Sequence, residues 1–228
     1  MTRLSRPLSA VAVGAAVAAA LTGCASGGAA APAAAGLAIG ATDLSGVCPA
    51  TVVIQTDWNP QAEQGGLFTL LGPDARIDAG KKSVSGPLMS QGEWTGVNVE
   101  IRAGGPAIGF SGVPAQMYTD PDILLGWVNT DDAIAASDTL PTTAVMSTFE
   151  KAPWAIMWDP KTYPDVHSIA DLAKTDATVR YFDGTTYMDY LTGSGLLRTD
   201  QLDGSYDGTP AAFIAADGTA AQQGFAPV

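Results

Sequence analysis

The chain alternates between short apolar strands, polar turns and helices, and this alternation limits its fold more than any other feature. The run 51–56 is β-branched and apolar enough to form a buried strand. Residues 57–60 end that strand, and the apolar spacing over 61–71 predicts a helix. Further strands are predicted over 97–102 and 122–128. Repeated strand, turn and helix units predict a parallel α/β sheet, with functional groups at the carboxyl ends of its strands.

The remaining segments of the first half are less regular. Residues 72–96 are rich in Gly, Pro, Lys and Ser and are predicted to form an exposed excursion. A short helix is predicted within 107–117, and another over 133–137, where Thr130 is an N-cap and two acidic residues occupy the first turn.

The second half carries its own series of strands and helices. Two strand-like runs, 144–149 and 154–158, flank a charged turn and are interpreted as segments that cross between two units. They are followed by predicted helices over 168–172, 185–193 and 209–216, and by predicted strands over 178–182 and 222–225.

The N-terminus has the pattern of a secretory signal. Arg3 and Arg6 precede an apolar stretch over 8–20 that is too short for a comfortable membrane span. The run Leu21-Thr22-Gly23-Cys24 resembles a bacterial lipobox, which implies that Cys24 is acylated and anchors the protein to the membrane. An ordinary signal with a chance cysteine is the alternative. Residues 24–46, mostly Ala, Gly and Pro at their start, are predicted to be a flexible tether.

Charge and composition exclude several functions. A formal net charge of −12 repels phosphate backbones, so no nucleic-acid partner is expected. If Cys24 is acylated, Cys48 has no partner for a disulfide. His167 is the only histidine, which argues against a metal site and against His-dependent catalysis, and it is predicted to be exposed. No metal and no cofactor are expected.

Several motifs, in order, resemble one family of receptors. The segments are 55–68, 100–106, 181–187 and 205–210, followed by 221–225. Together they are similar to the substrate-binding proteins related to thiamine-pyrimidine precursor binders, a group shared with nitrate, sulfonate and taurine receptors. The resemblance implies a type II periplasmic-binding-protein fold, in which two α/β lobes hold a ligand in the cleft between them. It also implies delivery of that ligand to an ABC-transporter permease, outside the cytoplasm and at the bacterial cell membrane.

The chain departs from that family at two places. Gln64 stands where members commonly carry histidine, so an imidazole role is lost there. The sequence ends at Val228 before the expected return strand, so lobe one is expected to be incomplete at its C-terminus, either in a fragment of a longer receptor or in a shortened fold. The predicted organisation is a signal peptide (1–23), a tether (24–46), the N-terminal part of lobe one (47–142), and lobe two with the start of the return crossing (143–228).

The candidate ligand-binding residues follow the predicted strand ends. Trp58 could offer a flat face to an aromatic ring, although it could equally be a core tryptophan. Glycine pairs and a helix N-terminus could present backbone amides to a ligand, and Tyr187 could stack on it or pack in lobe two. The complete set is Asp57, Trp58, Asn59, Gln64, Gly104, Gly105, Asp183, Gly184, Thr185, Thr186 and Tyr187. Met146, Trp154 and Trp158 are predicted to pack in the core.

Three functions are compatible with these residues. The first is a lipid-anchored solute receptor without enzymatic activity, for a small nitrogenous or sulfur-containing nutrient, with a pyrimidine as the first choice. The second is an enzyme that uses the same cleft on a small heteroaromatic or amine substrate, with Asp or Glu as general acid or base. The third is a surface interaction protein without a small ligand. A non-functional fragment of a longer receptor is a further alternative.

Overall fold

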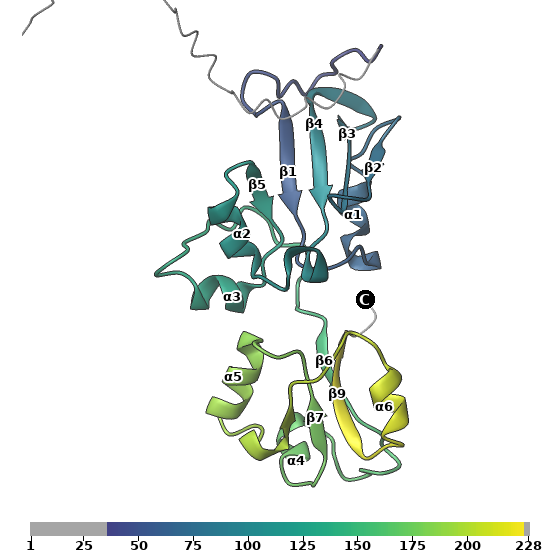
Figure 1. Ribbon diagram of the computed structural model, residues 1–228, viewed down its shortest axis with the longest axis vertical. Coiled ribbons are helices and arrows are strands. Elements are labelled where there is room, and N and C mark those ends of the chain that lie inside the picture. The colour runs from purple at the N-terminus through teal and green to yellow at the C-terminus, as the bar shows by residue number, and fades with distance from the viewer. Residues whose placement is uncertain (1–35, 226–228) are drawn as a thin grey trace, which may run out of the picture. The chain divides into compact units, whose positions relative to one another are not determined.

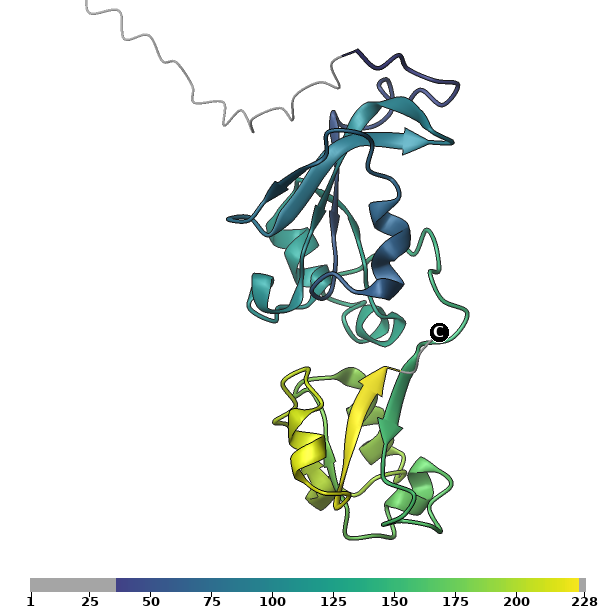
Figure 2. The same ribbon diagram turned by 90° about the vertical axis from the view of Figure 1, so that its right-hand side faces the viewer.

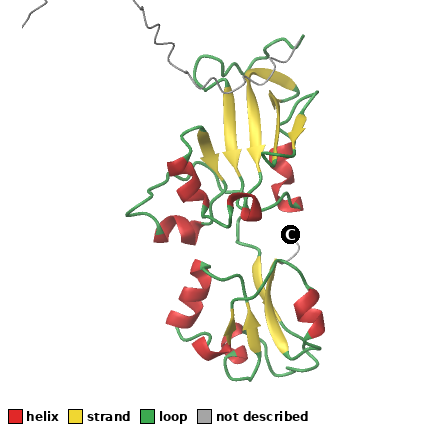
Figure 3. Ribbon diagram, viewed as in Figure 1, coloured by secondary structure: helices red, strands yellow, loops and turns green. Residues whose placement is uncertain are grey.

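The computed structural model describes residues 36–225 as an α/β fold with two separate mixed sheets. Figure 3 shows the strands of each sheet with helices and loops around them. Cys24, the predicted signal peptide and the first part of the tether lie outside the described residues. None of the described helices is long and apolar enough to span a bilayer.

The first sheet has five strands in the order β2-β3-β4-β1-β5. Their bounds are β1 (Thr51–Gln55), β2 (Arg76–Asp78), β3 (Ser83–Ser90), β4 (Glu93–Arg102) and β5 (Ile123–Gly126). β1 lies between β4 and β5 and runs parallel to both, as predicted, so the carboxyl ends of these three strands lie at one end of the sheet (Figure 1). β2 and β3 are antiparallel additions, so the sheet is mixed and the prediction of a purely parallel sheet is wrong.

The prediction of an exposed excursion over 72–96 is wrong, because this segment supplies β2, β3 and the start of β4. Gln91 and Gly92 both have positive φ, 51° and 84°, and join Ser90 to Glu93 as a two-residue hairpin turn. Pro87 lies where the register between β3 and β4 shifts, a position at which proline is tolerated. Long-range pairing with β4 therefore orders a segment whose local composition favours loops.

Short helices cover the first sheet. The predicted helix over 61–71 is a 3₁₀ turn, Ala62–Gln64, followed by α1 (Gly65–Phe68), and its Leu67 and Phe68 pack on Val52 and Ile54. α1 is the blue helix beside the strands in Figure 2. The second predicted helix is divided in the same way, into a 3₁₀ turn, Gly105–Ile108, and α2 (Val113–Thr119). α3 (Thr130–Ala135) begins after Asn129, one residue before the predicted cap.

The second sheet has four strands in the order β6-β9-β7-β8. Their bounds are β6 (Trp154–Met157), β7 (Thr178–Arg180), β8 (Leu202–Asp203) and β9 (Ala220–Phe225), and the helices are α4 (Ile169–Leu172), α5 (Thr186–Gly193) and α6 (Ala211–Ala215). The strands and helices predicted for this half are present apart from the run 144–149, whereas β8 and the 3₁₀ turn Thr199–Gln201 before it were not predicted. β7 is parallel to β9 and β8, whereas β6 is antiparallel to β9. Val179 and Ala221 pack with residues of α4 and α5 in the core.

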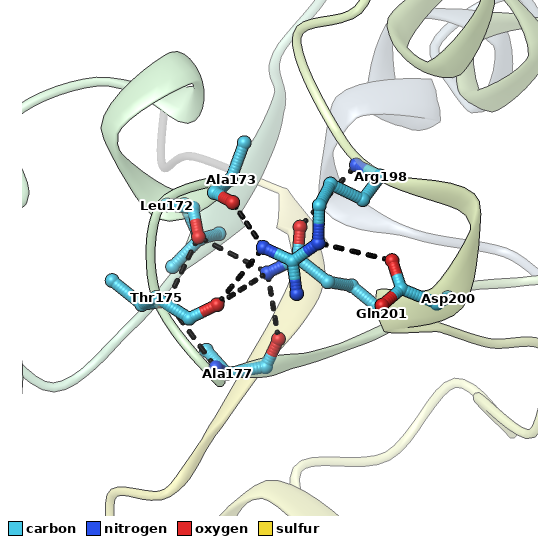
Figure 4. Close-up of polar contacts among 7 residues, drawn as sticks. All are labelled: Leu172, Ala173, Thr175, Ala177, Arg198, Asp200 and Gln201. Atoms are coloured by element: carbon cyan, nitrogen blue, oxygen red, sulfur yellow. Dashed lines mark hydrogen bonds and ion pairs between the residues drawn. The ribbon is translucent and has the colours of Figure 1, made fainter.

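Gln201 fixes the end of α4 in this second half. Its Nε2 donates to the carbonyls of Leu172, Thr175 and Ala177 at 3.1 to 3.3 Å, and its side chain is buried (Figure 4). Arg198 adds hydrogen bonds to the carbonyls of Ala173 and Thr175. Carbonyls at the end of α4 and just beyond it thus accept hydrogen bonds from two side chains, so this polar cluster has a structural role.

Three further segments have surroundings that their local sequence did not indicate. The run 144–149 forms no strand, and Met146 is 72% exposed instead of buried, because no neighbouring strand offers it backbone partners. β5 is an edge strand, and its Leu124 is 47% exposed. The end of the predicted tether is also held: the backbone N–H groups of Gly40 and Leu44 donate to carbonyls of Trp94 and Thr95.

Candidate functional site

The turn after β1 is held tightly against the turn after β4. The Thr56 hydroxyl donates to the carbonyls of Trp58 and Arg102, both at 2.9 Å. The N–H groups of Gly104 and Gly105 donate to the carbonyls of Trp58 and Asp57, also at 2.9 Å. The two glycine amides are therefore engaged inside the protein and are not offered to a ligand.

Both glycines are required by close approach. A Cβ on Gly104 would collide with the carbonyl of Thr56, and a Cβ on Gly105 would lie 2.8 Å from Cε3 of Trp58. Gly105 also has φ +56°, which a side chain disfavours. Because these two glycines have no side chain, the Trp58 ring can lie against the backbone of the neighbouring turn.

The half-buried Asp57 and the buried Gln64 form a polar pair. Nε2 of Gln64 donates to Oδ1 of Asp57 at 3.0 Å, and the Gln64 side chain is 2% exposed. Oε1 of Gln64 is buried and has no hydrogen-bond partner among the described residues. Burial raises the pKa of Asp57, and the negative charges of Glu63 and Asp132 raise it further, against hydrogen bonds that lower it.

Three aromatic rings meet beside this pair. The Trp58 ring centroid lies 5.3 Å from that of Phe182 and 5.9 Å from that of Phe110, and the Phe110 and Phe182 centroids are 5.3 Å apart. Trp58 and Phe110 follow strands of the first sheet, whereas Phe182 follows β7 of the second. Gly208 lies close to the Trp58 ring as well, so the predicted motif over 205–210 also reaches Trp58. We call Trp58, Phe110 and Phe182 the aromatic cluster.

The side chains of residues 183–186, before and at the start of α5, contact several parts of the protein. Thr185 donates to the Phe182 carbonyl at 3.0 Å, and Thr186 donates to Oδ1 of Asp132 at 2.8 Å. Gly184 has φ +79°, and a Cβ added there would meet open space. Asp183 accepts a hydrogen bond from the Tyr181 hydroxyl. This segment therefore meets both the aromatic cluster and the acidic start of α3.

Tyr187 and Asn59 do not join this group. The Tyr187 hydroxyl donates to Oε1 of Gln223, and its ring contacts Trp154 with a centroid distance of 4.5 Å. Burial raises the pKa of Tyr187, as expected for a packed phenol. Asn59 is exposed beyond the turn. Of the two roles left open for Tyr187, packing within the second sheet's own region fits the structure.

Sequence reasoning missed Phe110, Phe182 and Asp132 as members of the site. Phe110 lies in the run Gly109-Phe110-Ser111-Gly112, and its own φ is +59°. An aromatic residue among glycines was the available signal, because such a residue is rarely needed for a simple turn. Phe182 is the last residue of the predicted strand 178–182 and precedes candidates that were named, so the same strand-end argument extends to it.

The structure also limits other kinds of site. Within residues 36–225, no group of three or more His, Cys, Asp or Glu side chains is arranged to hold a metal ion, and His167 is exposed. An open pocket of about 360 Å³ lies between residues 158–160 and 213–218, and it contains none of the predicted ligand-binding residues. No family model, curated protein or solved structure matches this chain.

Proposed function

We propose that this protein is the lipid-anchored solute-binding component of an ABC importer, with a type II periplasmic-binding-protein fold. Its ligand is a small heteroaromatic nutrient similar to a thiamine-pyrimidine precursor. The anchor is Cys24 and the downstream partner is the transporter permease, in the extracytoplasmic space of a bacterium. The two mixed α/β sheets are compatible with two lobes, of which 47–142 and 143–228 are the proposed parts.

The observation that carries this proposal is the contact between Trp58 and Phe182, whose ring centroids are 5.3 Å apart. It brings a strand-end turn of the first sheet to a strand-end turn of the second. Ligands of α/β proteins bind outside the carboxyl ends of strands, where loops from several elements converge. The proposed binding site is the surface formed by the aromatic cluster together with Asp57 and Gln64.

The rings and the polar side chains of this site have different roles in binding. The rings of Trp58 and Phe110 supply apolar area for a planar ligand, and Phe110 is 55% exposed. The carboxylate of Asp57 supplies a hydrogen-bond acceptor that fixes the ligand's orientation, and the buried, unpaired Oε1 of Gln64 is a second acceptor for a ligand that enters beside it. Because Phe182 comes from the second sheet, a ligand at this place contacts both proposed lobes and stabilises their approach.

A second candidate function rests on one observation. A carboxyl group whose pKa is raised by burial, as at Asp57, is also what a general acid or base requires. An enzyme acting on a small heteroaromatic or amine substrate would use it as such. Asp57 has no nucleophilic partner in its hydrogen bonds, since its side-chain partner is Gln64. The receptor is therefore the better supported function.

Thermal unfolding with a ligand panel tests the proposal. The purified chain is melted alone and with thiamine-pyrimidine precursors, nitrate, taurine or alkylsulfonates. A ligand that binds only the native state stabilises it by RT ln(1 + [L]/Kd), about 2.7 kcal/mol at a hundredfold excess over Kd. We expect one class to raise the melting temperature while mass spectrometry detects no product. Formation of product would support the enzyme instead, and no shift with any class would contradict both.

A further inference from the structure

The electrostatics of the proposed site define the charge of its ligand. We infer that the site takes a planar organic cation with N–H donors, such as an amidinium or a protonated aminoheterocycle, and that it rejects nitrate and sulfonates. This inference rests on the proposed function and concerns the same residues.

Negative groups converge on the aromatic cluster. Asp57 immediately precedes Trp58, and the charges of Glu63 and Asp132 act on the Asp57 carboxyl. Asp132 is in turn joined to the first turn of α5 through Thr186. A buried carboxylate that feels two further carboxylates is relieved by a cation, whereas an anion adds to the repulsion.

A second, independent observation points to a ligand with donors. Oε1 of Gln64 is an unpaired acceptor on a side chain that is 2% exposed, and the same amide donates to Asp57. An unsatisfied buried acceptor is costly, so a ligand N–H that reached it would recover that cost. Two neighbouring acceptors favour a planar group with two N–H donors over a quaternary ammonium, which has none.

Several donors that could serve an anion are already engaged within the protein. Arg102, at the end of β4, forms ion pairs with Glu100 at 3.0 Å and Asp120 at 2.7 Å. Arg180, at the end of β7, pairs with Asp203 at 3.1 Å through Nε, whereas its Nη1 is buried and has no hydrogen-bond partner among the described residues. The amides of Gly104 and Gly105 donate to carbonyls of the neighbouring turn.

The N-terminus of α5 also provides little attraction for an anion. Asp132 lies beside its first turn, and Asp189 is within that turn, so its positive end is already compensated.

Aromatic faces add attraction for a cation. Trp58 and Phe110 present π-systems whose negative faces attract positive charge within about 6 Å of a ring centroid. Nitrate and sulfonates gain nothing from these faces. The aromatic cluster and the acceptors of Asp57 and Gln64 therefore select the same ligand class.

Three probes of nearly equal shape test the charge directly. Benzamidine, which is a cation at neutral pH, benzamide, which is neutral, and benzoate, which is an anion, are titrated into the full chain by calorimetry at fixed ionic strength. We expect benzamidinium to bind at least tenfold more tightly than benzamide, and benzoate to show no binding. Asp57→Asn is expected to remove the preference for benzamidinium over benzamide.

A matched variant separates local from overall charge. Asp74→Asn, at an exposed turn, changes the net charge of the chain by the same amount as Asp57→Asn. It should leave the affinities for benzamidine, benzamide and benzoate unchanged. Gln64→Met, which keeps the bulk but removes the acceptor, should lower the affinity for benzamidinium even if Asp57→Asn folds poorly.

The outcomes also distinguish this inference from the proposed function. Equal or tighter binding of benzoate, or no binding of benzamidinium, would overturn the inference. In either case, a shift in the ligand panel with a neutral or anionic compound would leave the receptor function standing. If no compound in either experiment binds, both proposals fail.

Discussion

The hydroxyl of Thr186 donates a 2.8 Å hydrogen bond to Oδ1 of Asp132, and so joins the first turn of α5 to the first turn of α3. The other Asp132 oxygen accepts from Nδ2 of Asn129, the N-cap of α3, at 3.3 Å. One carboxylate thus binds the side chain of its own helix's N-cap residue, binds an element of the second sheet's region and adds negative charge near Asp57. This contact and the aromatic cluster connect the two sheets' strand ends.

Removing that hydroxyl should weaken the connection measurably. Thr186→Val keeps the shape of the side chain but leaves Asp132 without this donor, and we expect a loss of about 1 kcal/mol in the free energy of unfolding. Thr186→Ser keeps the hydroxyl and should lose less than half of that amount. Urea unfolding of the two variants measures the difference, and equal losses would mean that the hydrogen bond contributes nothing.

The glycine at position 105 should matter through Trp58 and not through its backbone alone. Gly105→Ala and Gly109→Ala both place a side chain at positive φ, +56° and +61°, which costs each about 1 kcal/mol. Only the Cβ at 105 meets the Trp58 ring, whereas nothing lies within 4 Å of the one at 109. Trp58 fluorescence and ligand affinity should therefore change in Gly105→Ala alone. The same change in both variants would contradict the contact between position 105 and the Trp58 ring.

Trp58 itself is tested against a tryptophan of similar burial. Trp58→Leu removes an aromatic face from the proposed site, and the affinity for an aromatic ligand should fall by about fivefold or more. Trp94→Leu makes the same change at the start of β4, where the indole donates to the Val97 carbonyl, and binding should be unaffected. Circular dichroism checks that both variants remain folded. An unchanged affinity in Trp58→Leu would exclude a stacking role.

The strand ends could be predicted from the sequence, but their partners could not. The β-branched run before Asp57 and the helix predicted over 168–172 rest on local signals, and both predictions are confirmed. At the start of α4 the Ser168 hydroxyl accepts the backbone N–H of Asp171 as a cap does. Phe110 and Phe182 meet only because two distant turns converge. The hairpin over 76–90 was missed because pairing with β4 overrides its composition, which is rich in glycine and serine.

Asp57 should make the protein less stable at neutral pH than it would be without that charge. Burial raises the pKa of Asp57 in the folded state above that of the unfolded chain. Its contribution to stability is therefore fully present below the unfolded pKa and is lost as the pH rises through the folded pKa, by about 1.4 kcal/mol for each unit of difference. Asp57→Asn should unfold at a higher temperature at pH 7 and show a flatter pH profile. A lower melting temperature would show that the carboxylate is stabilising.

The Gln201 cluster predicts a purely structural effect. Gln201→Leu removes the side-chain donor to the carbonyls of Leu172 and Ala177, although Thr175 still donates to Leu172, and we expect a loss of about 2 kcal/mol in stability. Asp200→Asn, which removes the exposed ion pair to Arg198, should cost less than about 1 kcal/mol. Chemical unfolding compares the two. Neither variant should change ligand affinity, and a change in Gln201→Leu would extend the functional site to this cluster.

The most direct test of the central claim is calorimetric titration of the chain with a thiamine-pyrimidine precursor, in parallel for the unsubstituted protein and Trp58→Leu. We expect saturable binding of one ligand per chain without turnover, weakened in the variant, because the aromatic cluster and Asp57 form a single binding surface. Saturable binding that is identical in both proteins would place the ligand elsewhere. No binding of this ligand class to a cooperatively folded chain would contradict the proposed receptor function.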